Sequence, residues 1–417
     1  PVLLGDLEAL EAGLFALLEA LELLFGGDGQ PELGDDGTAP DELVLEIVDL
    51  GIGAHPVLFP GEALDALDQH AAVPGTVEDG DAADARRVAP ETPQVGLGAL
   101  LLGGGGDRHD GVLPRIKRAG NAADAAVAAA AVLAVTEPAS TGLGGDCFAL
   151  YFDAKTKHIS ALNGSGRAPV GLSLEWMRTQ GFTHMPVHSP HAVSVPGTVA
   201  GWADLLAQHG RMTLRETLVE AAYHAREGYP VHPVFAASWA RVEAFLRQGH
   251  HTEAYLLGGR APKAGEIMRL PELARTLQEI AEGGAAAFYE GRAALAIVDT
   301  LQALGGLMSP EDLKAHRSTW ETPIFTDYRG VRVYECPPNG QGLAALQALN
   351  VAEGWSLGDQ PWDSPERLHL MIEAMRLAFA DARQYVADNA TNPAPLEFLL
   401  SKPYAAERRT RITPGRA

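Results

Sequence analysis

Residues 163–169 contain the residue types that are best suited to bind a ligand. They read Asn-Gly-Ser-Gly-Arg-Ala-Pro and follow a predicted strand. Glycine allows a ligand to approach the backbone closely, and the guanidinium group of Arg167 can bind a carboxylate through two parallel hydrogen bonds. The segment therefore indicates a possible small-anion site. The alternative is a hairpin turn whose arginine is solvated or caps a helix, and the spacing alone favours that turn.

A second glycine-rich stretch, Gly-Leu-Gly-Gly-Asp at residues 142–146, lacks the pattern of a phosphate-binding loop. Such loops follow a strand, precede a helix and usually contain a lysine followed by serine or threonine. This stretch follows a predicted helix, precedes a predicted strand and has no such lysine. We predict a tight turn in which glycine adopts positive φ at low steric cost.

The cysteines and clustered histidines favour structural roles. The chain has two cysteines, too few for a disulfide scaffold or a four-cysteine zinc site. Cys147 leads into an apolar stretch, which predicts a buried and unreactive thiol, and Cys336 receives the same interpretation. His184, His188 and His191 lie in a loop broken by prolines, which lacks the framework that usually fixes zinc ligands. We therefore expect a solvated loop and no metal ion.

The elements that must position these residues are those of a packed α/β protein. The alanine-rich residues 121–135 predict a helix that can pack tightly against a sheet. Two strands are expected at residues 148–153 and 158–162, and Thr198 is predicted to cap the helix that follows it. Further helices are expected at residues 214–227, 233–247, 270–282, 286–304, 342–353 and 365–385, with a strand at residues 331–334.

Length, composition and charge exclude several classes of protein. A chain of 417 residues that is 46% apolar and 21% charged can bury a large core. The net charge of −22 comes mostly from residues 1–110, which hold 23 acidic residues and three arginines. Such a segment repels phosphate, so we expect neither a nucleic-acid partner nor binding to an anionic membrane. The longest uncharged apolar run, residues 125–135, is too short to span a bilayer.

The composition divides the chain near residue 112. Residues 1–112 contain no lysine and form an atypical acidic segment, whereas residues 113–417 have the composition of a packed domain. Within the acidic segment, residues 3–24 predict an amphipathic helix and residues 42–50 a strand or short helix. Residues 1–25 lack the basic start of a secretory signal, which predicts a cytoplasmic protein.

Many motifs between residues 113 and 417 resemble, in the same order, those of the γ-glutamyltranspeptidase family. The similarity begins with the segments at residues 120–128, 136–138, 142–148 and 163–169. It continues with Ser-Val-Pro-Gly-Thr-Val-Ala-Gly-Trp at 194–202, Gly-Gly-Leu-Met at 305–308, Asp-Tyr-Arg-Gly at 327–330, Pro-Pro-Asn-Gly-Gln-Gly at 337–342, the predicted helix at 373–385 and Leu-Leu-Ser-Lys-Pro-Tyr at 399–404. So many ordered motifs over so long a stretch make the resemblance specific.

The resemblance implies an α+β fold, the four-layer αββα sandwich of the N-terminal-nucleophile hydrolases. It also implies a precursor that cuts itself, after which the new N-terminal threonine of a small subunit attacks the γ-glutamyl carbonyl with its own α-amine as base. The substrates would be small molecules, glutathione-type γ-glutamyl amides, and no metal or organic cofactor would be needed. Because the similarity covers the large subunit, the nucleophilic threonine is expected beyond Ala417, in a small subunit from the same precursor.

The resemblance also implies which residues contact the acyl group. The arginine that binds glutamate in typical members would fall near Ser165, whereas in this sequence the arginine is Arg167. We therefore expect Arg167, with Asn163 and Ser165 beside it, to contact the acyl group. Asn339 and Gln341 are expected to form part of the pocket wall.

Two other functions remain open. The related cephalosporin and glutaryl acylases point to cleavage of β-lactam or glutaryl amides on the same scaffold. A non-catalytic binding protein is the second alternative, because no threonine between residues 113 and 417 lies in the family's nucleophile motif. The family's first strand and helix are not recognisable in residues 1–112, so this segment is either a genuine extension or the product of a wrong reading frame. A wrong frame would leave an edge of the sheet exposed.

Overall fold

A three-stranded antiparallel sheet in the order β3-β4-β7 lies at the centre of the molecule. β3 (Phe148–Asp153) pairs along its whole length with β4 (His158–Asn163), and the end of β4 pairs with β7 (Thr319–Glu321). This pairing confirms the two strands predicted from the sequence. The computed structural model describes residues 46–48, 57–59, 120–186, 189–249, 252–361 and 363–413.

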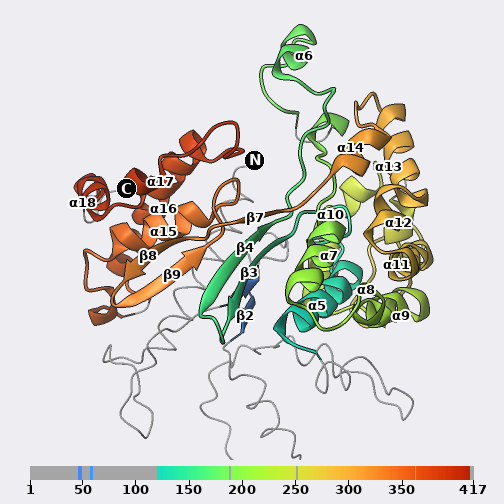
Figure 1. The fold of residues 1–417 in the computed structure, drawn as a ribbon, viewed down its shortest axis with the longest axis horizontal. Coiled ribbons are helices and arrows are strands. Elements are labelled where there is room, and N and C mark those ends of the chain that lie inside the picture. The colour runs from blue at the N-terminus through green and yellow to red at the C-terminus, as the bar shows by residue number, and fades with distance from the viewer. Residues whose placement is uncertain are drawn as a thin grey trace, which may run out of the picture.

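A group of helices lies on one side of this sheet, on the right in Figure 1. Their apolar side chains form a continuous core with Ala149 and Leu162 of the sheet. The helices are α5 (Ala122–Thr136), α7 (Thr198–His209), α8 (Leu214–Thr217), α9 (Val219–Glu227), α10 (Pro233–Leu246), α11 (Pro271–Gly283), α12 (Ala285–Tyr289), α13 (Arg292–Ala303) and α14 (Pro310–Ala315). The short helix α6 (Leu174–Thr179) projects away from them at the top of Figure 1.

Helix α5 is buried along almost its whole length because most of its residues are alanine. Its N-terminus is closed by a capping box, in which Asn121 and Asp124 exchange side-chain and backbone hydrogen bonds. Asp124 is fully buried, and its carboxylate also accepts hydrogen bonds from the backbone N–H groups of Arg211 and Met212. These donors stabilise the buried charge, so one acidic residue fixes both the start of α5 and the loop after α7.

A second group of elements follows β7 and lies on the left in Figure 1. It consists of the hairpin β8 (Ile324–Tyr328) and β9 (Val331–Glu335) and of the helices α15 (Gly342–Ala352), α16 (Pro365–Tyr385), α17 (Leu396–Leu399) and α18 (Lys402–Arg409). Helix α15 packs against α16, against α18 and against the hairpin. It is therefore the central helix of this group.

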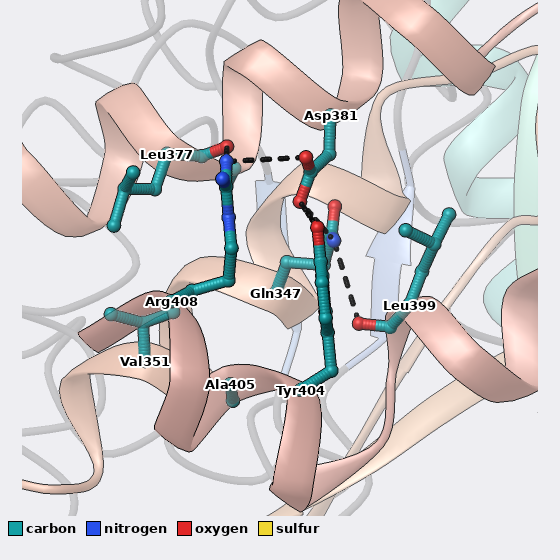
Figure 2. A pocket seen from close by; sticks show the side chains of 9 residues that line it. Gln347, Val351, Leu377, Asp381, Leu399, Tyr404, Ala405 and Arg408 are labelled. Atoms are coloured by element: carbon teal, nitrogen blue, oxygen red, sulfur yellow. Dashed lines mark hydrogen bonds and ion pairs between the residues drawn. The ribbon is translucent and has the colours of Figure 1, made fainter. Parts of the chain in front are cut away.

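Helix α18 is held to α15 and α16 by a buried polar cluster around Asp381, shown in Figure 2. Asp381 forms an ion pair with Arg408 Nη2 at 3.2 Å, and these side chains are only 10% and 11% exposed. The carboxylate also accepts hydrogen bonds from Tyr404 Oη at 2.9 Å and from Gln347 Nε2 at 3.1 Å. Arg408 donates a further bond to the carbonyl of Leu377. The cluster thus joins three helices through one carboxylate.

Two predicted helices are divided where the chain turns sharply. Residues 214–227 separate at Leu218 into α8 and α9, and residues 286–304 separate into α12 and α13. At the second division, a Cβ on Gly291 would lie 2.1 Å from the carbonyl oxygen of Ala287. Only glycine fits this close turn. The other predicted helices and the strand β9 agree with the structure to within one residue at each end.

The acidic segment contributes two short strands to the described residues. β1 (Glu46–Val48) and β2 (Val57–Phe59) form an antiparallel pair, and β1 lies against β3. The stretch predicted as a strand or short helix at residues 42–50 is therefore a strand where it is described. The helix predicted at residues 3–24 lies outside the described residues. Within the described parts of the chain, no helix combines the length and the apolar character needed to cross a membrane.

Candidate functional site

The three predicted acyl contacts begin where β4 ends, and two of them belong to a hydrogen-bond network. Asn163 Oδ1 accepts bonds from the backbone N–H of Ser165 at 3.0 Å and from its hydroxyl at 2.7 Å. Asn339, which precedes α15, donates to Ser165 Oγ at 2.9 Å and accepts from Asn163 Nδ2 at 2.9 Å. Asn163 Nδ2 also donates to Glu321 on β7. The network therefore connects β4 and β7 of the central sheet with the loop that precedes α15.

Arg167 lies beside this network with its side chain exposed to solvent. Its backbone carbonyl accepts a hydrogen bond from Val195 N at 3.0 Å. Among the residues that the structure describes, its guanidinium group has no hydrogen-bond or ion-pair partner. An exposed guanidinium without a partner is free to bind a carboxylate. Arg167 therefore caps none of the described helices, and a solvated arginine is compatible with ligand binding.

Two glycines allow the segment around Arg167 to lie directly against residues 194–198. A Cβ on Gly166 would lie 1.6 Å from the carbonyl oxygen of Val195. Similarly, a Cβ on Gly197 would lie 1.6 Å from the carbonyl oxygen of Gly164. No other residue can replace glycine at such distances without moving the backbone. The glycines of residues 163–169 therefore serve backbone packing, which holds the backbone next to Arg167 against residues 194–198.

The glycine-rich turn at residues 142–146 supports the same region from the other side. The carbonyl of Gly145 accepts hydrogen bonds from Gly197 N at 2.8 Å and from Thr198 N at 2.9 Å. Asp146 Oδ1 accepts a hydrogen bond from Gly166 N at 3.0 Å, and the Thr198 hydroxyl donates to the carbonyl of Asp146. The turn thus binds both segments that carry the candidate site.

Two predictions about this region are wrong. None of Gly142, Gly144 and Gly145 has positive φ, so the turn forms without the left-handed backbone conformation that was predicted. Thr198 is the first residue of α7 and Gly197 is the N-cap. The Thr198 hydroxyl does not cap the helix because it donates instead to the carbonyls of the glycine-rich turn.

An open cavity of about 280 Å³ lies at this turn. Its lining consists of small and polar residues from the end of α5 to the start of β3, namely Pro138, Ala139, Ser140, Thr141, Gly142, Gly145 and Asp146. A cavity of this volume is at the lower end of the range found for small-molecule sites. It provides space for a small polar ligand next to the segment that carries Arg167.

A buried histidine lies close to the same charges. His316 stacks on Tyr289 with ring centroids 5.5 Å apart, and the Tyr289 hydroxyl donates to the carbonyl of Pro196 at 2.8 Å. Burial lowers the pKa of His316, and the positive charge of Arg167 lowers it further, whereas Asp146 raises it. His316 is therefore favoured in its neutral form, which avoids repulsion with Arg167.

The other candidates from the sequence do not join this site. Cys147 is 3% exposed and packs against Gly201, which confirms the predicted buried thiol, and Cys336 is half-buried. His184 is exposed, and His191 packs between two aromatic side chains of the α6 excursion. His188 lies outside the described residues.

No group of His, Cys, Asp and Glu side chains suited to hold a metal ion occurs among the described residues. Gln341, expected in the pocket wall, is an exposed residue at the start of α15. In the described structure it has no hydrogen bond to the network around Ser165, in contrast to Asn339.

Three residues of the site were missed by the sequence interpretation. Asp146 was treated only as part of a turn, although an acidic residue after two glycines is a signal that could have been used. Glu321 and His316 gave no signal, because each is separated from residues 163–169 by about 150 positions in the sequence. Their proximity comes only from the pairing of β4 with β7 and from the packing of α12 and α14.

The fold matches that of solved γ-glutamyltranspeptidases, which places the chain in the N-terminal-nucleophile hydrolase class with the αββα, α+β fold. The sequence profile of gamma-glutamyltranspeptidase matches residues 115–417. The chain therefore belongs to the γ-glutamyltranspeptidase family, as the motifs predicted.

Individual relatives refine this assignment. The glutathione hydrolase-like YwrD proenzyme of Bacillus subtilis (strain 168) is 38% identical over 298 residues, which are 70% of this chain and 56% of the relative. A solved γ-glutamyltranspeptidase of Helicobacter pylori has a TM-score of 0.68 and 27% identity, covering 82% of this chain and 95% of that one. The solved cephalosporin acylase of Bacillus halodurans has a TM-score of 0.67 and 39% identity, and the match covers 72% of this chain and 57% of that one. The chain spans about half the length of the curated relatives that it matches.

Proposed function

We propose that this chain binds the acyl group in an enzyme that hydrolyses γ-glutamyl amides of the glutathione type or transfers their γ-glutamyl group. The observation that supports this proposal is the exposed guanidinium of Arg167, which has no partner among the described residues and lies beside the ordered Asn163–Ser165–Asn339 network. An arginine in this setting can bind the α-carboxylate of a γ-glutamyl group bidentately. The hydroxyl of Ser165 is held in place by Asn163 and Asn339 and offers a hydrogen bond to the same group.

The chemistry requires a nucleophile, which we place in a small subunit made from the same precursor. Curated relatives are described as proenzymes, and this proposal assigns the nucleophile to their remaining half. The threonine hydroxyl would attack the γ-carbonyl, its proton would pass through the threonine α-amine to the leaving amine, and an ester would form. Water or an acceptor amine would then release the acyl group. In this scheme residues 1–417 bind and orient the acyl group.

An assay with two substrates tests the proposal. Residues 1–417 are combined with a threonine-led small subunit of the family and offered a γ-glutamyl anilide and a glutaryl anilide. We expect release of aniline from the γ-glutamyl substrate, and we expect Arg167→Gln to reduce kcat/KM by about tenfold or more. Binding without turnover after reconstitution would favour the non-catalytic alternative, and turnover of the glutaryl substrate alone would contradict the γ-glutamyl proposal.

An acylase acting on β-lactam or glutaryl amides is the second candidate function. It is supported by the 39% identity to the cephalosporin acylase of Bacillus halodurans. It is also supported by Ser165, a neutral residue near the position where typical γ-glutamyltranspeptidases have arginine. The two candidates differ in whether the acyl group has an α-ammonium group, and the two-substrate assay distinguishes them directly.

We also propose that residues 113–417 form the functional unit and that residues 1–112 are a separate acidic segment. Limited proteolysis tests this division. A folded extension resists cleavage before residue 112, whereas a segment that does not belong to the fold is trimmed to a stable product. We further propose a cytoplasmic location, which cell fractionation would test.

A further inference from the structure

Residues 194–198 support the backbone of the candidate site and lead directly into helix α7. Val195 N donates a hydrogen bond to the carbonyl of Arg167 at 3.0 Å. Gly197 lies so close to Gly164 that a Cβ on it would be 1.6 Å from the Gly164 carbonyl oxygen. A shift of residues 194–198 would therefore move the backbone of Arg167.

The requirement for glycine at position 197 leaves α7 without a cap of its own. Gly197 is the N-cap of α7 and makes no side-chain hydrogen bond to the first turn. The first backbone N–H groups of a helix have no partner within it. A serine, threonine or aspartate N-cap usually accepts a bond from the second or third helical residue. The third residue of α7 is Ala200, so its N–H group needs an acceptor from elsewhere in the chain.

Tyr289 on helix α12 supplies this acceptor, although it is 89 positions away in the sequence. Its hydroxyl oxygen accepts the hydrogen bond from Ala200 N at 3.1 Å, and the same hydroxyl donates to the carbonyl of Pro196 at 2.8 Å. Burial raises the pKa of Tyr289, so the hydroxyl keeps its proton in neutral solution and remains a donor. One side chain thus holds the residues on both sides of the N-cap.

The ring of Tyr289 is held by neighbouring aromatic side chains. It stacks with His316, which follows α14, at 5.5 Å between ring centroids, and it meets the ring of Phe288 nearly at right angles at 5.1 Å. All three side chains are buried. The position of the Tyr289 hydroxyl is therefore set by α12 and by the residue after α14, outside the segments that carry the site.

The other hydrogen bonds of residues 194–198 have a different origin. Apart from bonds within α7, those of the described residues join the site segment, residues 163–169, or the glycine-rich turn at residues 142–146. These partners are themselves parts of the site region. Tyr289 is thus the side chain, in the described part of the chain, that hydrogen-bonds this region to the helices on the right in Figure 1.

We propose that Tyr289 is a positioning residue of the acyl site, which replaces the missing N-cap of α7 and holds residues 194–198 against the backbone of Arg167. This inference rests on the proposed function, because it takes Arg167 as a residue that binds the acyl group. It assigns no contact with the ligand to Tyr289. The hydroxyl acts through Pro196 and through the start of α7.

The variant Tyr289→Phe tests the inference because it keeps the ring and removes both hydrogen bonds. The probe is L-glutamine, the simplest γ-amide of glutamate, and its binding to residues 1–417 is measured by isothermal titration calorimetry. We expect the affinity to fall about fivefold, because the arrangement that binds is less populated without these bonds.

Tyr404→Phe is the matched control. It also removes a hydroxyl that is hydrogen-bonded inside the protein, but the partner of Tyr404 is Asp381, in the second group of elements. We expect this variant to bind L-glutamine as tightly as the unmodified chain. The comparison separates positioning of the site from a general effect of losing a tyrosine hydroxyl.

A second measurement follows the proposed route without any ligand. Nuclear magnetic resonance on protein with isotope-labelled valine gives the hydrogen-exchange rate of the Val195 amide, which is bonded to the carbonyl of Arg167. We expect exchange to be about fivefold faster in Tyr289→Phe, since local opening becomes easier when a hydrogen bond is lost. The rate in Tyr404→Phe should be unchanged.

Each outcome has a distinct meaning. Weaker binding together with faster Val195 exchange, both confined to Tyr289→Phe, supports the inference. Unchanged affinity, unchanged Val195 exchange or an equal loss of affinity in Tyr404→Phe overturns the inference and leaves the acyl contacts intact. Failure of the unmodified chain to bind L-glutamine overturns the inference together with the acyl contacts of the proposed function.

A measurement on the unmodified chain covers the case in which Tyr289→Phe fails to fold. If the hydrogen bonds of Tyr289 favour binding, binding must favour these bonds to the same degree. Saturation with L-glutamine should therefore slow exchange of the Ala200 amide, which is bonded to Tyr289. The amide of Met212, bonded to Asp124 beyond the other end of α7, should not change. An unchanged Ala200 amide, or equal slowing of both amides, overturns the inference.

Discussion

Two polar clusters built from similar residues have opposite environments in this molecule. The cluster around Asp381 contains an arginine, a tyrosine hydroxyl and a glutamine amide, and it is buried between three helices (Figure 2). The Ser165 cluster, which we define as Asn163, Ser165 and Asn339 with Arg167 beside it, lies half-buried to exposed at the end of β4.

The two clusters also differ in the volume of the cavity next to them. Asp381 lines a cavity of about 10 Å³, enough for one water molecule at most. The segment carrying Arg167 adjoins the turn that lines the open cavity of about 280 Å³. In the first cluster the arginine is paired with a carboxylate, and in the second the guanidinium has no partner among the described residues. Similar side chains therefore stabilise the fold in one place and are available to a ligand in the other.

The largest effect is expected from Asp381→Ala. Removing one partner of a buried ion pair leaves the other charge uncompensated, so the free energy of unfolding should fall by about 3–5 kcal/mol. Urea unfolding followed by tryptophan fluorescence measures this change. Asp327→Ala is the control, because the Asp327–Arg332 pair is 57% and 43% exposed and should contribute less than about 1 kcal/mol. Equal losses in the two variants would contradict the assignment of Asp381 to a structural role.

In contrast to Asp381→Ala, Arg167→Gln should weaken ligand binding and leave the stability of the fold almost unchanged. Because the guanidinium has no partner in the described structure, the free energy of unfolding should change by about 0.5 kcal/mol or less. Affinity for L-glutamine should fall by about tenfold or more, since a charged hydrogen-bond donor is lost. Calorimetry and urea unfolding on the same preparations measure both quantities. The exposed Arg178 on α6 supplies the control Arg178→Gln, which should change neither. A large loss of stability in Arg167→Gln would remove the contrast between the two clusters.

Ser165→Ala and Asn339→Ala should have smaller effects that are not additive. Each removes the hydrogen bond between Asn339 Nδ2 and Ser165 Oγ, so each should cost about 1 kcal/mol of stability. The double variant should cost less than the sum, because the shared bond can be lost only once. A double-mutant cycle of urea unfolding gives the coupling energy. Full additivity would show that the bond does not contribute in solution.

The smallest effect at neutral pH is expected from Tyr404→Phe, and it should grow in alkaline solution. Burial and the neighbouring Asp381 carboxylate raise the pKa of Tyr404 from 10.0 to about 12. Between these values the folded state keeps a proton that the unfolded state has lost, so stability falls as pH rises through this window. Tyr404→Phe should reduce that decline, which unfolding measurements at pH 9 and pH 11 would reveal. An unchanged decline would show that the Tyr404 hydroxyl is not buried beside Asp381.

The local elements of this protein could be predicted from the sequence because their signals are local. The alanine run that becomes α5 and the periodic residues of α16 form the predicted helices. The strands β3 and β4 also appear where alternation and a short turn indicated them. The divisions at Leu218 and at Gly291 were missed, because a helix break caused by packing leaves little trace in periodicity.

The motifs determined the family, and the residue types identified Arg167 as a candidate ligand-binding residue. The sequence could not show that Arg167 has no partner in the described structure, nor that Asn339, some 170 positions later, holds Ser165 in place. Spacing also gave the wrong roles for Thr198 and for the glycines at residues 142–145. Which charges are paired and which are free depends on residues that are distant in sequence and adjacent in space, so only the tertiary structure decided it.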